Sequence, residues 1–138
     1  TYFSLDPSWR IQAKFVPTQG KKLRITDITG RTYLEDSPGE LHFTIKGRKY
    51  MLAAGGTTDE FFIVFGDLTN KKTTYGGGRF LYANGPDKKG NVILDFNKSL
   101  NPPCAFTPFA TCPLPTKKNI MKLIVDAGEK SRGFLAHK

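Results

Sequence analysis

The stretch that decides the fold is LHFTIKGRKYML, residues 41–52. Its apolar and polar side chains alternate from Leu41 to Ile45 and again from Lys49 to Leu52, with Gly47 between the two runs. Alternation with a period of two places one set of side chains on each face of a β-strand. A glycine between two such runs permits a tight turn. The stretch therefore predicts a β-hairpin.

The same signal recurs along the chain. Residues 9–15 alternate cleanly, whereas residues 61–65 are continuously apolar, which indicates a strand buried on both faces or an inner strand of a barrel. Two further runs flank a turn-rich connector at residues 84–90, and they predict a second hairpin. The remaining expected strands, the two of that hairpin included, are residues 23–28, 31–34, 79–82, 91–96 and 120–125.

This pattern predicts an all-β fold. No window of ten or more residues shows a helical stripe, and only a short helix near residues 115–119 is expected. Eight or nine strands around one small core leave open edges unless the sheet closes, so we expect a small antiparallel β-barrel, with a β-sandwich as the alternative. The length of 138 residues fits one all-β domain, residues 1–138.

The net charge of +9 is concentrated in the second half of the chain. Residues 1–69 hold 9 basic and 8 acidic side chains, whereas residues 70–138 hold 12 and 4. The excess comes largely from lysine pairs, which either attract an anionic partner or are simply solvated in turns. The aromatic residues lie in the expected strands and one loop, which argues against nucleic-acid binding.

Nothing in the sequence predicts a membrane span, because no apolar run approaches the roughly 20 residues that one needs. The first residues show no signal peptide. We therefore expect a soluble protein that is either cytoplasmic or, if an upstream signal has been removed, exported to the periplasm or lipid-anchored. The oligomeric state is left open.

Residues 101–115 depart from the strand pattern and are here called the Pro–Cys loop. They contain five of the nine prolines and both cysteines. Prolines exclude an inner strand, so we expect an ordered loop that packs Phe106 and Phe109 against the barrel. The spacing of Cys104 and Cys112 fits neither a zinc site nor a C-x-x-C motif. A disulfide and buried free thiols are equal alternatives, and no metal or cofactor is expected.

A glycine-rich stretch, YGGGR at residues 75–79, could expose backbone amides beside Arg79 and so hold an anion. It is not a P-loop, and a wide turn before a strand is the alternative. If residues 79–82 pair with residues 91–96, Arg79 lies opposite Asp95. That pair is either a structural ion pair or an arginine, oriented by Asp95, that binds a ligand carboxylate or phosphate. Glu129 carries the same ambiguity.

The sequence gives little indication of a catalytic site. His42 and His137 are the only histidines, and both are expected to be ordinary surface residues. The sequence contains neither G-x-S-x-G nor H-E-x-x-H.

Several blocks together resemble one family. They are TTYGGGRFL at residues 73–81, LDFN at 94–97, NPPCAFTP at 101–108, CPLP at 112–115 and AGEK at 127–130. In this order they resemble the bacterial domain of unknown function 1684, closely over residues 60–130 and loosely before. The family has no assigned activity, and its members often carry a further N-terminal segment, some as exported lipoproteins. The resemblance implies the following family-characteristic positions: Asp67, Thr69, Tyr75, Gly76, Arg79, Asp95, Asn97, Asn101, Cys104, Cys112 and Glu129.

The function expected first is a module that binds a small anionic ligand at the mouth of the barrel, lined by the Pro–Cys loop and the glycine-rich stretch. Its candidate ligand-binding residues are Asp67, Thr69, Tyr75, Gly76, Arg79, Asp95, Asn97, Asn101 and Glu129. One alternative is a hydrolase-type enzyme that uses Asp67, Asp95 or Glu129 as acid or base. Another is an interaction domain whose lysine pairs bind an acidic surface.

Overall fold

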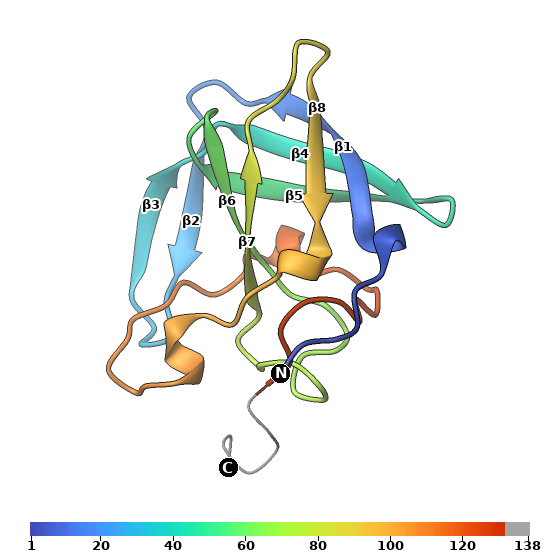
Figure 1. Ribbon diagram of the computed structural model, residues 1–138. Helices are drawn as coiled ribbons and strands as arrows, with labels where there is room; N and C mark the ends of the chain where they lie inside the picture. Colours follow the sequence, from blue (N-terminus) through green and yellow to red (C-terminus); the bar gives the residue numbers. More distant parts are fainter. Residues whose placement is uncertain (132–138) are drawn as a thin grey trace.

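A computed structural model describes residues 1–131, and the regular secondary structure of this part of the chain is mainly β-strand (Figure 1). Short 3₁₀ turns are its only helical elements. The strands are β1 (Arg10–Pro17), β2 (Lys22–Thr26), β3 (Thr32–Asp36), β4 (Gly39–Ile45), β5 (Arg48–Gly56), β6 (Glu60–Phe65), β7 (Arg79–Asn84) and β8 (Asn91–Asp95). The 3₁₀ turns are η1 (Pro7–Trp9), η2 (Phe96–Lys98), η3 (Pro103–Ala105) and η4 (Lys117–Asn119). No described helix is long and apolar enough to cross a membrane.

Six strands form one antiparallel sheet in the order β7-β6-β5-β4-β1-β8. The sheet curls until its two edge strands, β7 and β8, face each other, which gives a nearly closed barrel (Figure 1). The predicted barrel is therefore confirmed. The hairpin predicted at residues 41–52 is β4 and β5, with Leu41 opposite Leu52 and Phe43 opposite Tyr50.

The second predicted hairpin is wrong. Strand β7 pairs with β6 and β8 pairs with β1, so residues 79–82 and 91–96 lie at opposite edges of the sheet. The connector closes a turn of its own, because the Asp87 carboxylate accepts hydrogen bonds from the backbone N–H groups of Lys89 and Asn91. It is also held to the β5–β6 turn, where Gly85 N donates to Asp59 O.

The last predicted strand, residues 120–125, is also absent. The segment makes one isolated bridge, between Gly66 and Ile120. The N–H of Val125 donates to the side chain of Asp67, and the carbonyl of Leu123 accepts from Leu68 N. These backbone groups bind a loop instead of a neighbouring strand, so the apolar run lies across one end of the barrel.

The continuous apolar run of β6 is buried on its inner face and half-buried on its outer face, and β6 lies between β5 and β7, so the prediction of an inner strand of a barrel is confirmed. Phe61, Ile63 and Phe65 point into the barrel and are fully buried. Phe62 and Val64 point outward, where the separate β2–β3 hairpin covers them. The core is completed by aliphatic and aromatic side chains from the other strands, chiefly Leu41, Leu52, Leu81, Val92, Leu94 and Phe96.

The side chain of buried Asn119 joins two strands that diverge. Strands β5 and β6 pair only at Gly55 and Gly56. Beyond that point Asn119 Oδ1 accepts from Ala53 N at 2.8 Å, and its Nδ2 donates to Ala53 O and Val64 O at 2.9 Å. One amide thus replaces the missing ladder bonds, and it comes from η4, the short helical turn expected near residues 115–119.

Candidate functional site

Arg79 lies in the core and not in a pocket. Its guanidinium donates to the carbonyls of Val125, at 2.9 Å, and Ala127. Asp67 Oδ1 lies 3.6 Å from its Nη2, and the Phe65 ring centroid lies 5.2 Å from its central carbon. Burial lowers the pKa of the Arg79 guanidinium, and the charge of Asp67 opposes that shift. With 0% of its surface exposed, Arg79 holds the C-terminal segment across the barrel end.

The predicted partner of Arg79 is therefore wrong: it is Asp67, and not Asp95. The Asp67 carboxylate also accepts from Thr69 Oγ1 and from Val125 N, each at 2.8 Å. Thr69 Oγ1 in turn lies 2.8 Å from Thr74 Oγ1. Asp67 and Thr69 are both buried, so they organise the loop that precedes Arg79.

The glycine-rich stretch forms a tight turn against β6. Gly78 has a φ of +87°, and a Cβ at this position would lie 2.6 Å from Phe65 O, so the turn requires glycine. Gly76 is exposed, whereas Tyr75 is half-buried. Burial raises the pKa of Tyr75, and the nearby thiols of Cys104 and Cys112 add to that shift. The stretch is therefore a turn before a strand, as the alternative states, but the turn is tight and not wide, because Gly78 N donates to Tyr75 O.

Asn101 and Glu129 join the same end of the barrel. Glu129 Oε1 accepts from Asn101 N at 2.7 Å, and Asn101 Nδ2 donates to Lys130 O at 2.9 Å. Glu129 O lies 3.5 Å from Arg79 Nη1. Asp67, Arg79, Asn101 and Glu129 thus belong to one hydrogen-bonded network. The crevice and grooves described below contain none of these four side chains.

Asp95 and Asn97 lie elsewhere, where β8 ends. Asp95 Oδ1 accepts from the backbone N–H of Asn97 at 3.1 Å and from its side-chain amide at 2.9 Å, and so caps η2. Asn97 Oδ1 accepts from Asp6 N, which ties down the N-terminal segment. The carboxylates of Asp67, Asp95 and Glu129 thus accept hydrogen bonds from different backbone groups. The enzyme alternative needs two of these side chains to lie together as acid and base, and the structure does not bring them together.

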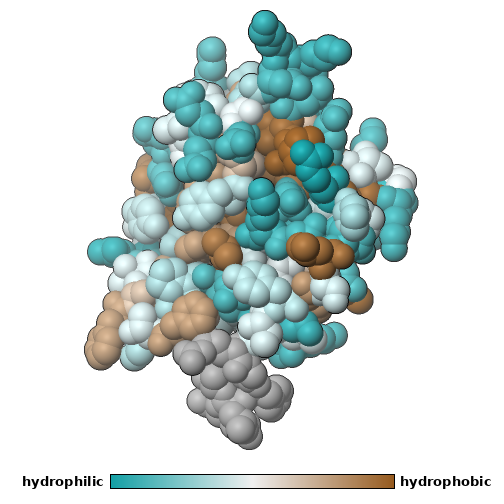
Figure 2. All heavy atoms as spheres, viewed as in Figure 1, coloured by the Kyte–Doolittle hydropathy of each residue, from teal (hydrophilic) through white to brown (hydrophobic). Residues whose placement is uncertain are grey.

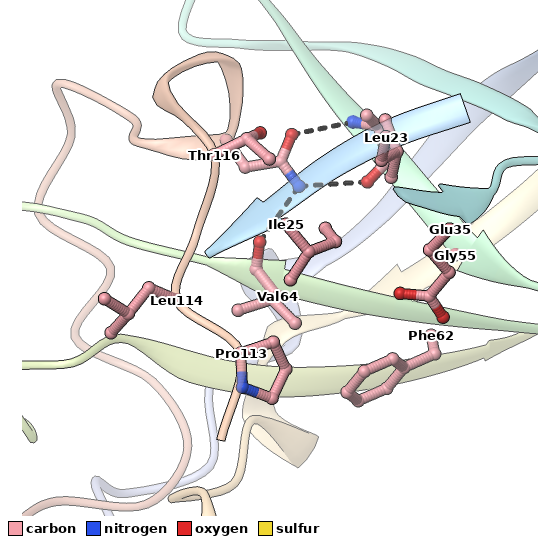
Figure 3. Close-up of a pocket in the computed structure, with 11 residues that line it drawn as sticks. Leu23, Ile25, Glu35, Gly55, Phe62, Val64, Pro113, Leu114 and Thr116 are labelled. Carbon is pink, nitrogen blue, oxygen red and sulfur yellow. Dashed lines mark hydrogen bonds between the residues drawn. The ribbon is translucent and has the colours of Figure 1, made fainter. Parts of the chain in front are cut away.

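The Pro–Cys loop lines a crevice and not the mouth of the barrel (Figure 3). Pro113, Leu114 and Thr116 close one side of it, and the β2–β3 hairpin and the outer face of β5 and β6 form the others. Its lining is largely apolar, with Glu35 among the few polar groups. Its volume of about 20 Å³ has room for one water molecule, so in this closed form it excludes larger ligands.

Two other expectations concern exposed residues. Phe109 is 91% exposed and Phe106 is 48% exposed, so the predicted packing of these rings against the barrel is wrong. The loop is anchored instead by its backbone, because Leu114 N donates to Thr26 O and Ile28 N donates to Cys112 O. His42 is exposed beside Glu40, whereas His137 lies outside the described residues.

A polar groove of about 350 Å³ runs along the seam of the barrel, where β7 and β8 face each other without forming a ladder. We call it the seam groove. Its walls come from β1, β7, β8 and the β7–β8 connection. Polar and charged side chains dominate the lining, which includes Arg10, Gln12, Tyr82, Asn84, Asp87, Asn91, Asp95 and Lys98.

The carboxylates of the seam groove have hydrogen-bond partners, whereas its cations have no ion-pair partners among the described residues. Arg10 lies opposite Asp95 in the β1–β8 register, yet Asp95 turns away to cap η2. Asp87 accepts two backbone N–H bonds, of which that from Asn91 contributes most to lowering its pKa. Among the described residues, neither Arg10 nor Lys98 has an ion-pair partner. Both cations are therefore available to an anion.

Further cations lie on the elements that border the groove. The β7–β8 connection adds two exposed lysines, and exposed Lys14 donates to the carbonyl of Lys89. Figure 2 shows hydrophilic side chains over this top part of the molecule. Of the charged side chains that line the groove, Arg10 and Lys98 accompany Asp87 and Asp95, and both of these carboxylates are already hydrogen-bonded.

A third concavity, of about 530 Å³, lies at the end of the barrel near Trp9. Its charged groups are Asp6, Asp126 and a single cation, Lys46. The Trp9 indole N–H donates to Asp126 Oδ1 at 3.1 Å. This groove therefore suits an anion less well than the seam groove does.

Sequence reasoning missed the cations of the seam groove. Arg10 and Gln12 stand at the polar positions of the alternating run 9–15, and Lys98 follows the LDFN block. Such positions are indistinguishable in sequence from an ordinary solvated strand face. Of the predicted ligand residues, Asp95 alone lines the seam groove. Within residues 1–131, no group of three or more His, Cys, Asp or Glu side chains is placed to hold a metal ion.

Comparisons with known proteins place the chain among uncharacterised relatives. The family model described as "Protein of unknown function (DUF1684)" matches residues 1–130. The structure is similar to the solution NMR structure of the uncharacterized protein from gene locus rrnAC0354 of Haloarcula marismortui, with a TM-score of 0.75 and 26% sequence identity. That match covers 94% of this chain and 75% of the other. A search of curated proteins finds no match.

Proposed function

Because the chain belongs to the DUF1684 family, for which no activity is assigned, we propose from its own geometry that it is a module that binds a small anionic ligand in the seam groove. The observation that carries the proposal is that Arg10 and Lys98 have no ion-pair partner within residues 1–131 and lie beside two carboxylates that are hydrogen-bonded to backbone N–H groups. A guanidinium with no partner can bind a carboxylate or phosphate through two parallel hydrogen bonds.

The rest of the groove defines the ligand further. Its volume falls in the range of small-molecule sites. Gln12, Asn84 and Asn91 supply amides that can both donate and accept hydrogen bonds, and Tyr82 supplies a partly exposed ring. A small polar ligand with one phosphate or carboxylate group and further hydroxyl or amide groups matches this lining. Asp95 positions η2 and the strand end in this scheme and does not contact the anion.

Isothermal titration with citrate and with inorganic phosphate tests the proposal. The double variant Arg10→Gln/Lys98→Gln removes both free cations, and each lost charged contact weakens binding about 10-fold or more. The matched control is Lys49→Gln/Lys118→Gln, which removes the same charge from exposed sites outside the groove.

If both double variants weakened anion binding equally, the specific site would be refuted. The interaction-domain alternative, in which the lysine pairs act through net charge alone, would then be favoured. Such binding would also fall steeply with salt in every variant. Binding of neither anion by the wild-type protein would refute an anion site in the groove.

A further inference from the structure

The two cysteines of the Pro–Cys loop lie against each other's backbone. Cys104 N donates to Cys112 Sγ at 3.2 Å, and Cys112 N donates to Cys104 Sγ at 3.2 Å. Each sulfur therefore lies beside the residue that carries the other sulfur. Both cysteines are free thiols in this structure, and Cys104 Sγ also donates to Ala110 O at 3.1 Å.

We propose that Cys104 and Cys112 form a disulfide by thiol–disulfide exchange, and that this cross-link clamps the β2–β3 hairpin over the crevice of Figure 3. A disulfide needs its two Cβ atoms within about 4.5 Å and its two sulfurs in contact. The reciprocal N–H···S pair shows that each sulfur lies 3.2 Å from the backbone nitrogen of the other cysteine, so the two residues are neighbours in space. Only the seven residues 105–111 separate the two cysteines, and one of these residues is a proline.

The exchange has a defined order. Cys104 is partly exposed, whereas Cys112 is 7% exposed. The Cys104 thiolate attacks a low-molecular-weight disulfide, which forms a mixed disulfide and releases one thiol. Cys112 then attacks the Cys104 sulfur and releases the second thiol. The two protons of the cysteines pass to the two released thiols, and the external disulfide is reduced as the protein is oxidised. Burial raises the pKa of Cys112 to about 11, which lowers the fraction of Cys112 thiolate available for this second step.

The cross-link acts on the hairpin through two backbone hydrogen bonds next to Cys112, which together form the isolated bridge between Asp27 and Pro113. Ile28 N donates to Cys112 O at 3.0 Å, and Leu114 N donates to Thr26 O at 2.9 Å. Pro113 and Leu114 also line the crevice, so the loop segment that is bonded to the hairpin also forms part of the apolar lining. Fixing Cys112 restricts this junction, because the hairpin forms no ladder with the barrel sheet.

The test oxidises the full chain with glutathione disulfide and reduces a second sample with a phosphine. After denaturation and alkylation, mass spectrometry is expected to find no alkylated cysteine and the loss of two hydrogen atoms in the oxidised sample. The midpoint of thermal unfolding should rise on the order of 5–10 °C on oxidation, from the loop-closure relation for so short a loop. Hydrogen exchange at the amides of Ile28 and Leu114 should slow in the oxidised protein.

The control is Cys104→Ser/Cys112→Ser, in which oxidant should change neither the unfolding midpoint nor the exchange. Two alkylated cysteines after equilibration with oxidant, or a mixed disulfide that persists on Cys104, would overturn the cross-link. An intramolecular disulfide that leaves exchange at Ile28 and Leu114 unchanged would overturn the clamp.

Discussion

Arg79 shows at the scale of one residue how a charge can be a structural element of the core. Its guanidinium faces one carboxylate and two backbone carbonyls of the segment that closes the barrel end. Removing one partner of such a buried pair leaves the other charge without compensation. We therefore expect Arg79→Met to lower the free energy of unfolding by ~3–5 kcal/mol.

Arg79→Lys should lie between wild type and Arg79→Met, because a lysine keeps the charge but cannot reach the same carbonyls with a planar fork. Urea unfolding monitored by fluorescence measures all three proteins, with exposed Arg48→Met as the matched control. A stability of Arg79→Met equal to that of the control would show that the buried network does not hold the barrel end.

The same residue marks a limit of sequence reasoning. Alternation correctly places Arg79, Leu81 and Ala83 on one face of their strand. The choice of partner for the arginine depends on which strands are neighbours, and that depends on the path of the connector after β7. Because β7 pairs with β6, the arginine meets the loop that follows β6, which carries Asp67, and not Asp95 on β8.

The β2–β3 hairpin is an element whose turn is organised by one buried carboxylate. Asp27 accepts hydrogen bonds from Thr29 Oγ1 at 2.5 Å, Thr29 N at 2.9 Å and Arg31 N at 3.0 Å. The bond from the Thr29 hydroxyl is the main cause of its lowered pKa. A carboxyl group whose pKa is lower in the folded state stabilises that state above its ordinary value of 3.8. This stabilisation is lost as the pH falls through the folded-state pKa.

We therefore expect Asp27→Asn to lower the unfolding midpoint at pH 6, and the difference from wild type to shrink as the pH falls below 3.8. Thermal unfolding followed by circular dichroism across this range measures both curves. Asp59→Asn, at an exposed turn position, is the control and should run parallel to wild type. A constant offset between Asp27→Asn and wild type at every pH would contradict the role of the carboxylate charge.

At the scale of elements, periodicity predicted most strand positions and the pairing of the 41–52 hairpin, but not the pairing of strands joined by longer connections. The runs at residues 9–15, 41–45 and 61–65 are strands because their side chains must serve two faces of a sheet. The run at 120–125 carries the same apolar signal but lies across the barrel end, since Asp67 and Leu68 take its backbone groups. Turn-rich connectors such as residues 84–90 close hairpins and long crossings alike, so composition alone could not separate the two.

At the scale of the whole molecule, the barrel is a sheet closed at one point along its seam. Phe80 and Leu100 exchange two backbone hydrogen bonds of 2.8 Å, and no ladder joins β7 to β8. Seam geometry also explains why the candidate site was hard to predict. Its cations come from β1 and η2, which are far apart in sequence and meet only because the sheet curls.

The open seam makes a prediction about backbone protection. Successive residues of a strand direct their backbone N–H and C=O groups to opposite sides. Phe80 directs these groups toward Leu100 at the seam, so Tyr82 also directs its backbone groups toward the seam. Leu81 directs its backbone groups toward β6. The same reasoning directs Leu94 toward β1 and Ile93 toward the seam. Hydrogen exchange followed by NMR should therefore be faster at Tyr82 and Ile93 than at Leu81 and Leu94, by an order of magnitude or more.

Each comparison is between neighbouring residues of one strand. The free energy of global unfolding is therefore the same for both amides and cannot cause a difference between their exchange rates. Equal protection at Tyr82 and Leu81 would mean that β7 and β8 pair in solution and that the seam groove is closed. Addition of citrate should slow exchange at Tyr82 and Ile93 while leaving Leu81 and Leu94 unchanged, because a ligand in the groove covers the seam backbone alone. Slowing at all four amides would instead indicate general stabilisation of the folded state by the anion.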